Sequence, residues 1–254
     1  MNAFGLALAL AVGMVLGLLG GGGSILALPI FLYVFKLPVE PAIAMSLAVV
    51  SMSSFVGFLG HWRQRSVSFR IGVPFGAVAI VTAFVTASLT HFVPDALQLG
   101  LFAAFAGTSA IVMLRDALRP ERPAVESEPP ARKGRFTWLV ALQACAVGAL
   151  TALIGAGGGF VIVPALVYLA GVPVKAAVGS SLLIITLNAL AGFLGYVGRV
   201  EVDWRLVLSF TGIAAVGAVI GARLSRRLSA RRIKLAFALL IIALGTYLIL
   251  RRVL

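Results

Sequence analysis

The chain alternates between long apolar stretches and short polar loops, and this pattern predicts a helical membrane protein. Apolar stretches of roughly 20 residues match the length of a helix that crosses a bilayer. Three such stretches follow one another in each half of the chain. The predicted membrane helices span residues 41–60, 71–91 and 96–117 in the first half and 176–197, 206–225 and 232–250 in the second.

A shorter, interrupted apolar unit precedes these three helices in each half. Its first segment (3–19, and 136–153) ends in a glycine cluster, and a second apolar segment follows (24–35, and 160–170). A helix over the 24–35 segment rises only about 18 Å at 1.5 Å per residue, so it is too short to cross a bilayer alone. We therefore expect a half-helix at this place in each half.

The two halves are copies of one another. A shift of 135 positions aligns them without a gap. Glycine, proline and serine residues stay in register over about 40 positions, which chance similarity between apolar segments would not produce. The matched pairs include Gly20/Gly155, Gly22/Gly157, Gly23/Gly158, Pro29/Pro164, Pro38/Pro173, Ser46/Ser181, Gly57/Gly192 and Gly60/Gly195.

Composition identifies lipid as the solvent of this fold. The chain is 61% hydrophobic and only 11% charged, whereas about a quarter of an average soluble domain is charged. The net charge of +13 would suggest nucleic acid in a soluble protein. Here the basic residues lie in short loops, where they set membrane orientation and meet anionic lipid head groups. We expect membrane lipid, and no nucleic acid, as a partner.

The basic residues also discriminate between two topologies. If each interrupted unit crosses once, the halves are parallel and the most basic loops, 114–135 and 223–234, lie on opposite sides, against the positive-inside rule. If each unit is a hairpin that enters and leaves on one side, the halves are inverted. Both loops, together with loop 61–70, then become cytoplasmic, and both termini face outward. The charge bias favours the inverted arrangement.

The predicted fold is therefore an all-α polytopic membrane protein with two homologous, inverted repeats. Each repeat is a glycine-broken helical hairpin followed by three transmembrane helices. The first transmembrane repeat covers 1–118, a cytoplasmic linker rich in proline and charge covers 119–135, and the second repeat covers 136–254.

The two glycine clusters are the first candidate for substrate binding. Glycine breaks helices, and unwound backbone at membrane depth is tolerated where it is buried in protein or lines a cavity. The helix that follows would offer free N–H groups and a positive dipole end to an oxyanion. Glycine pairs such as Gly13/Gly17 and Gly217/Gly221 instead fit close helix packing. The candidate substrate-binding residues here are Gly20, Gly21, Gly22, Gly23, Ser24, Pro29, Gly155, Ala156, Gly157, Gly158, Gly159 and Pro164.

Polar side chains on the helices after the half-helices are the second candidate. Ser46 and Ser181 are equivalent, as are Ser53 and Asn188. Hydroxyls and amides donate hydrogen bonds to an anion without a net charge to trap it. Interhelical hydrogen bonds, or bonds to the helix's own carbonyls, explain such residues equally well.

Several absences narrow the function. No Asp or Glu lies deep in an apolar stretch, although carriers of cations usually place a carboxylate in the membrane. No catalytic set and no metal-ligand spacing occurs, and the single cysteine, Cys145, has no partner for a disulfide. We therefore expect no enzyme activity, no metal and no cofactor. His61 and His91 lie near the predicted interfaces, and we expect them to be loop residues.

The residues around both glycine clusters resemble the TauE/SafE family, the sulfite exporter or toluene-sulfonate uptake permease family formerly called DUF81. The similar segments are GGGGSILALPIFLYVFKLPVEPAIAMSL (20–47) and GAGGGFVIVPALVYLAGVPVKAAVGSSL (155–182). The resemblance implies a multi-pass carrier of the bacterial inner membrane for small sulfur-containing oxyanions. It also implies a site formed by the two glycine clusters with Pro29, Pro164, Ser46 and Ser181.

The resulting expectation is a secondary transporter of a small sulfur-containing anion, such as sulfite or an organosulfonate, working by alternating access. An inside-negative potential favours anion exit, by about 2.3 kcal/mol per charge per 100 mV, so export is the expected direction. A passive anion channel and a non-transporting membrane scaffold remain alternatives. The sequence defines neither the coupling ion nor the oligomeric state.

Overall fold

The computed structural model contains helices and no strands among the residues it describes. These are residues 3–20, 24–94, 96–98, 100–101, 104, 107–108, 111, 114–115, 138–154, 159–168, 171–229, 232, 235–236, 239 and 242. The α-helices are α1 (Ala3–Leu19), α2 (Ser24–Pro29), α3 (Val39–Arg63), α4 (Phe69–Leu89), α6 (Trp138–Ile154), α7 (Gly159–Tyr168), α8 (Val174–Tyr196) and α9 (Trp204–Ser225).

Helices α3, α4, α8 and α9 are long and apolar enough to cross a membrane, while α1 and α6 are shorter apolar helices. Their bounds confirm the corresponding sequence predictions to within about three residues at either end. The predicted helices over 96–117 and 232–250 fall largely outside the described residues.

The expected half-helices are present. Helix α2 contains Pro29 and continues as a π-helical turn, η2 (Ile30–Val34). Proline lacks an N–H donor and clashes with the preceding turn, which accounts for the change in winding at this point. Helix α7 has 10 residues, about 15 Å in length.

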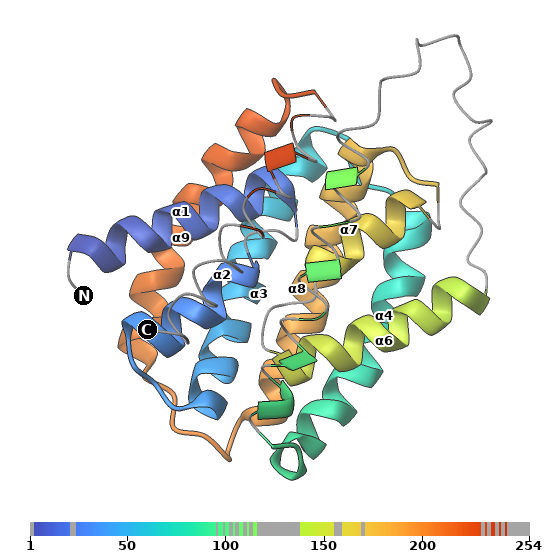
Figure 1. Ribbon diagram of the computed structural model, residues 1–254. Coiled ribbons are helices and arrows are strands. Elements are labelled where there is room, and N and C mark those ends of the chain that lie inside the picture. Colours follow the sequence, from blue (N-terminus) through green and yellow to red (C-terminus); the bar gives the residue numbers. More distant parts are fainter. Residues whose placement is uncertain are drawn as a thin grey trace, which may run out of the picture.

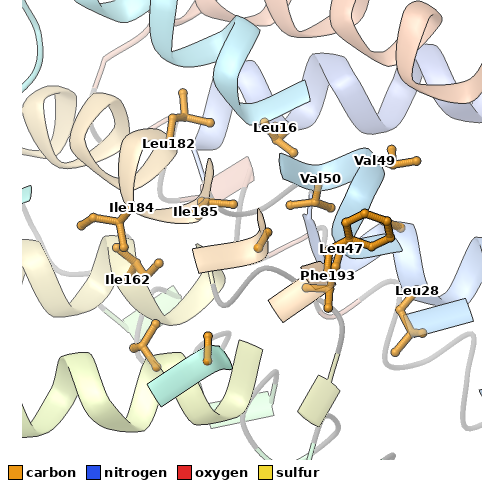
Figure 2. Packing of buried hydrophobic residues seen from close by; sticks show 14 of the residues in the cluster. Leu16, Leu28, Leu47, Val49, Val50, Ile162, Leu182, Ile184, Ile185 and Phe193 are labelled. Carbon is orange, nitrogen blue, oxygen red and sulfur yellow. The ribbon is translucent and has the colours of Figure 1, made fainter. Parts of the chain in front are cut away.

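Helices α3 and α8 form the centre of the molecule, and two outer pairs flank them (Figure 1). Helix α1 packs against α9 on one side, and α6 packs against α4 on the other. Each outer pair therefore joins one helix from each half of the chain. Figure 2 shows how side chains from α1, α2, α3, α7 and α8 meet in a single apolar core.

The interhelical contacts recur at the 135-residue offset found in the sequence. Gly13 lies against Ala214, and the equivalent residues Gly148 and Ala79 lie against each other. Two further contacts are repeated in the same way. The contact of Gly57 with Leu182 corresponds to that of Gly192 with Leu47, and the contact of Gly60 with Ala222 corresponds to that of Gly195 with Ala87.

The glycine pairs assigned to packing in the sequence do pack. Added side-chain atoms at Gly13 and Gly17 would meet the backbone of Ala214 and Ala218, and those at Gly217 and Gly221 would meet the backbone of α1. Small residues allow this close backbone approach. Residue numbers increase together along both helices in these contacts, so α1 and α9 run in the same direction.

Helices α3 and α8 run in opposite directions, because Gly57 meets Leu182 near the start of α8 whereas Leu47 meets Gly192 near its end. Helix α3 runs parallel to α9, since Gly57 and Gly60 face Ala218 and Ala222 in ascending order. Helix α1 is therefore parallel to α3, although α2 and η2 lie between them in the chain.

Candidate functional site

The first glycine cluster begins at Gly20, whose backbone conformation only glycine adopts at little cost. Gly20 has φ +70°, in the left-handed region that costs other residues roughly 1–2 kcal/mol. A Cβ at Gly20 would lie 2.5 Å from Ser181 Oγ and 3.1 Å from Val178 O. The structure thus brings together two of the predicted site residues, Gly20 and Ser181. Gly21, Gly22, Gly23, Gly155, Ala156, Gly157 and Gly158 lie outside the described residues.

The two half-helices meet inside the protein. Ser24, the first residue of α2, is fully buried. Helix α7 begins at Gly159 and includes Pro164, and it contacts α2. The segments that follow the two glycine clusters are therefore neighbours in the structure.

Ser46 and Ser181 use their hydroxyls within their own helices. Ser46 Oγ donates to Ile43 O at 2.8 Å, and Ser181 Oγ donates to Val178 O at 2.8 Å. The two bonds are equivalent under the 135-residue offset. The hydroxyl proton of each serine is therefore satisfied by a carbonyl of its own helix.

A pseudo-two-fold relationship is centred on α3 and α8. Ser51 Oγ donates a 2.9 Å hydrogen bond to Thr186 O, and these residues are 135 positions apart. A residue that contacts its own equivalent must lie near the axis relating the two halves. Thr186 Oγ1 in turn donates to Leu182 O at 2.7 Å.

Ser53 and Asn188 are equivalent residues just beyond this crossing, and both are fully buried. Each is two residues, or about 3 Å, along its helix from the axis. Because the helices are antiparallel, the two side chains lie at different levels on either side of the crossing. Ser53 Oγ and Asn188 Oδ1 have no hydrogen-bond partner among the described residues.

The hydrogen bonds around Asn188 fix which atom of its amide is unpaired. Thr151 Oγ1 donates its single proton to Val147 O at 2.8 Å, so its lone pair must accept from Asn188. Asn188 Nδ2 makes this 2.7 Å bond, which orients the amide. A buried unpaired carbonyl oxygen costs about 1–3 kcal/mol, so the Asn188 amide is a candidate for binding a polar ligand or water.

Sequence reasoning left three buried polar residues near these helices out of the candidate site. Thr151 orients Asn188, while Ser54 Oγ and Thr211 Oγ1 have no partner among the described residues. Each is a single hydroxyl in an apolar helix, and helices carry many hydroxyls that bond only to their own carbonyls. The repeat gives no signal either, because their equivalents are Leu16, Ala189 and Gly76.

The sequence interpretation of His61 was wrong. His61 is not a loop residue but a member of α3, and only 2% of its surface is exposed. Its Nε2 lies 3.0 Å from Gly17 O and its Nδ1 lies 3.1 Å from Ser66 Oγ. His91 falls in the 3₁₀ turn η3 (Thr90–Phe92).

Charged side chains are distributed unequally between the two ends of the molecule. We call the end where α3 and α9 finish and α4 and α8 begin the basic end; among the described residues of these segments it has no carboxylate. Lys36, Glu40, Arg199, Glu201, Asp203 and Arg205 lie at the opposite end. The charged residues of the basic end are Arg63, Arg65, Arg70, Lys175, Arg223, Arg226 and Arg227.

Within the described part of the chain, no three His, Cys, Asp or Glu side chains gather as a metal site would require. Four helices long and apolar enough to cross a membrane, with buried hydroxyl and amide groups between them, define a multi-pass helical membrane protein. The chain belongs to the sulfite exporter TauE/SafE family, which it matches over residues 5–248. Its function is membrane transport, and it is not an enzyme.

Named relatives agree with this assignment. A protein of Xylella fastidiosa (strain 9a5c), named a probable membrane transporter protein, is 34% identical over 94% of this chain and 92% of its own length. The relative YdhB of Bacillus subtilis, with the same description, is 29% identical over 84% of this chain and 85% of its own. A third, MJ0441 of Methanocaldococcus jannaschii, is 25% identical over 96% of both chains. No solved structure shows a significant match.

Proposed function

We propose that this protein is a secondary carrier that exports a small sulfur-containing anion, such as sulfite or an organosulfonate, across the bacterial inner membrane. The observation that supports this most directly is the family match over residues 5–248, whose description is sulfite exporter. The buried neutral donors of α3 and α8 suit a small oxyanion that must be released as well as bound.

The substrate would bind between the two hairpins and the central helices. Gly20, Ser24 and Ser181 would line one half-site, and the second cluster from Gly155 to Gly159 would line the other, together with Ser46. Ser53 and Asn188 would complete the two half-sites near the pseudo-two-fold axis. The absence of a buried carboxylate among the described residues spares the anion electrostatic repulsion.

Alternating access would arise from two inverted repeats, residues 1–118 and 136–254, joined by a cytoplasmic linker over 119–135. Antiparallel packing of α3 and α8 about Ser51 and Thr186 supports inversion, because a two-fold axis across two antiparallel spanning helices lies in the membrane plane. The parallel directions of α1 and α3 support a hairpin at each glycine break. The basic end would face the cytoplasm under the positive-inside rule.

Counterflow in proteoliposomes tests this proposal. Vesicles holding the purified protein and excess unlabelled sulfite are diluted into labelled sulfite. We expect transient accumulation of label that excess external sulfonate or thiosulfate reduces. Linear, non-saturating flux without counterflow would instead identify a channel, and no flux of any of these anions by folded protein would contradict the assigned substrate class.

A double substitution, Gly22→Leu with Gly157→Leu, tests the two glycine clusters as the site. We expect membrane insertion to persist and counterflow to be lost, because the leucine side chains would occupy space that this proposal assigns to the substrate. Normal flux in this variant would place the substrate elsewhere.

A further inference from the structure

His61 and Tyr196 occupy the same position in the two halves and make the same contact. His61 Nε2 lies 3.0 Å from Gly17 O, and Tyr196 OH donates to Ala152 O at 2.9 Å. Gly17 and Ala152 are also equivalent, and each precedes its glycine cluster by three residues. In both halves, a side chain near the end of a central helix therefore makes a hydrogen-bonding contact with a backbone carbonyl of the helix that precedes the glycine cluster.

The two side chains that make this contact, His61 and Tyr196, differ in their acid–base chemistry. A tyrosine hydroxyl stays protonated across physiological pH, whereas the charge of a histidine changes between about pH 5 and 8. Gly17 O can only accept a hydrogen bond, so His61 Nε2 must carry a proton in every state that keeps the 3.0 Å contact.

The second ring nitrogen decides whether the surrounding hydrogen bonds can all form together. Ser66 Oγ lies 3.1 Å from His61 Nδ1 and 3.0 Å from His61 O. The serine hydroxyl has one proton, so with neutral histidine it serves either Nδ1 or the carbonyl. When Nδ1 is protonated it donates to Ser66 Oγ, and Ser66 then donates to His61 O. Only the doubly protonated ring satisfies all three contacts at once.

At the basic end, the described residues offer no carboxylate to pair with this proton. Helix α1, which supplies Gly17, has no ionisable side chain. Among the described residues, the charged groups that α3, the α3–α4 loop, α4, α8 and α9 bring to this end are all basic: Arg63, Arg65, Arg70, Lys175, Arg223, Arg226 and Arg227. Within the part of the chain that the structure describes, a proton on His61 would therefore be held by hydrogen bonds to Gly17 O and Ser66 Oγ.

We propose that His61 is a proton-binding site that controls the α1–α2 hairpin, so that transport depends on the protonation state of this one repeat. When both ring nitrogens are protonated, hydrogen bonds connect α1 through His61 to Ser66 and restrain the hairpin. Loss of the Nδ1 proton weakens this restraint. Substrate exchange is therefore faster when His61 is neutral. This inference rests on the proposed carrier function for its effect on transport, but proton binding at His61 does not.

Proton binding can be measured without any substrate. The chain has two histidines, so His91→Gln leaves His61 as the single histidine signal in nitrogen NMR of protein in lipid nanodiscs. We expect the His61 ring to gain its second proton as the pH is lowered, and we expect Ser66→Ala to weaken this proton binding because it removes the acceptor for Nδ1–H. A ring that stays neutral throughout, or a transition that Ser66→Ala leaves in place, overturns the proposal.

The effect on transport is read from the ratio of variant to wild-type counterflow, which cancels the titration of sulfite itself. Glutamine can donate to Gly17 O and accept from Ser66, so His61→Gln imitates neutral histidine. We expect the ratio of His61→Gln to wild type to rise about fivefold or more toward acid pH, while the ratio for the matched variant Tyr196→Phe stays constant. A constant ratio for His61→Gln overturns the proposed control. If sulfite is not transported, the NMR measurement alone decides whether His61 binds a proton.

Discussion

Ser51 Oγ donates a 2.9 Å hydrogen bond to the carbonyl of Thr186, the residue that occupies the same position in the other half of the chain. This contact marks the place where α3 and α8 cross. Polar groups on both sides of it are buried, and several lack partners among the described residues. The crossing thus divides the interior into two related but chemically unequal halves.

Ser51→Ala removes this bond and should lower the free energy of unfolding by about 0.6 kcal/mol, the average for side-chain hydrogen bonds inside membrane proteins. Thermal unfolding of purified protein in detergent would measure the loss. Thr186→Val is the control, because Thr186 supplies its backbone carbonyl to Ser51. If Thr186→Val proves more harmful than Ser51→Ala, the crossing does not depend on this bond.

Two glycines of α9 allow a matched test of the close packing between α1 and α9. A Cβ at Gly217 would meet Leu10 O, whereas one at Gly212 would meet nothing within 4 Å. Gly217→Ala should therefore cost about 1–3 kcal/mol through overpacking. Gly212→Ala should be neutral or stabilising by about 0.5–1 kcal/mol. Equal melting temperatures for the two variants would contradict the parallel α1–α9 interface.

Gly20 and Gly171 both have positive φ, at 70° and 66°, but only Gly20 lies against another helix. Gly20→Ala adds a clash with Ser181 to the backbone strain that Gly171→Ala shares. We expect Gly20→Ala to slow counterflow by about tenfold or more, the equivalent of 1.4 kcal/mol, and Gly171→Ala to remain near wild type. Similar rates for both variants, at equal amounts of inserted protein, would remove Gly20 from the site.

We expect transport to require the unpaired amide oxygen of Asn188 and not the volume of its side chain. Asn188→Leu fills similar space without polar atoms, and we expect at least about a tenfold loss of counterflow. Asn188→Ser introduces the residue found at the equivalent position, Ser53, and should retain part of the activity. Full activity of the leucine variant would show that the buried amide serves only to pair with Thr151.

Single cysteines introduced into a Cys145→Ser background would establish orientation. We expect Arg65→Cys and Arg227→Cys to resist a membrane-impermeant thiol reagent in intact cells and to react after permeabilisation. Gly198→Cys, at the opposite end, should react from outside. Labelling of residues 65 and 227 from opposite sides would contradict the proposed inverted repeats, because α3 and α9 end together in the structure.

Much of the fold follows from local sequence properties. The lengths of the apolar stretches, Pro29 and the glycine clusters predicted α1, α3, α4, α8 and α9 and both half-helices within a few residues of their observed ends. Helix length and interruption depend on short-range hydrogen bonding and on residues without a normal donor or Cβ. The 135-residue offset likewise predicted which residues are equivalent, and the packing role of Gly13 and Gly217 was confirmed.

The candidate site was less accessible to such reasoning. Ser181 was predicted as a site residue, but its contact with Gly20 joins positions far apart in the chain. The sequence pattern made His61 an interfacial loop residue because it stands near the end of an apolar stretch. Only packing against α1 showed that the ring is buried and hydrogen-bonded to Gly17.

The sequence by itself determined a membrane-spanning helical chain, its internal repeat and its family resemblance, because these depend on composition and on the order of residues. Tertiary structure decided that α1 pairs with α9 and α6 with α4, that Asn188 is oriented by Thr151 and that His61 contacts Gly17. Nearly every apolar helix face can pack against another in lipid. The choice among them therefore rests on backbone approach at particular small residues and on a few buried hydrogen bonds, whose partners no local pattern reveals.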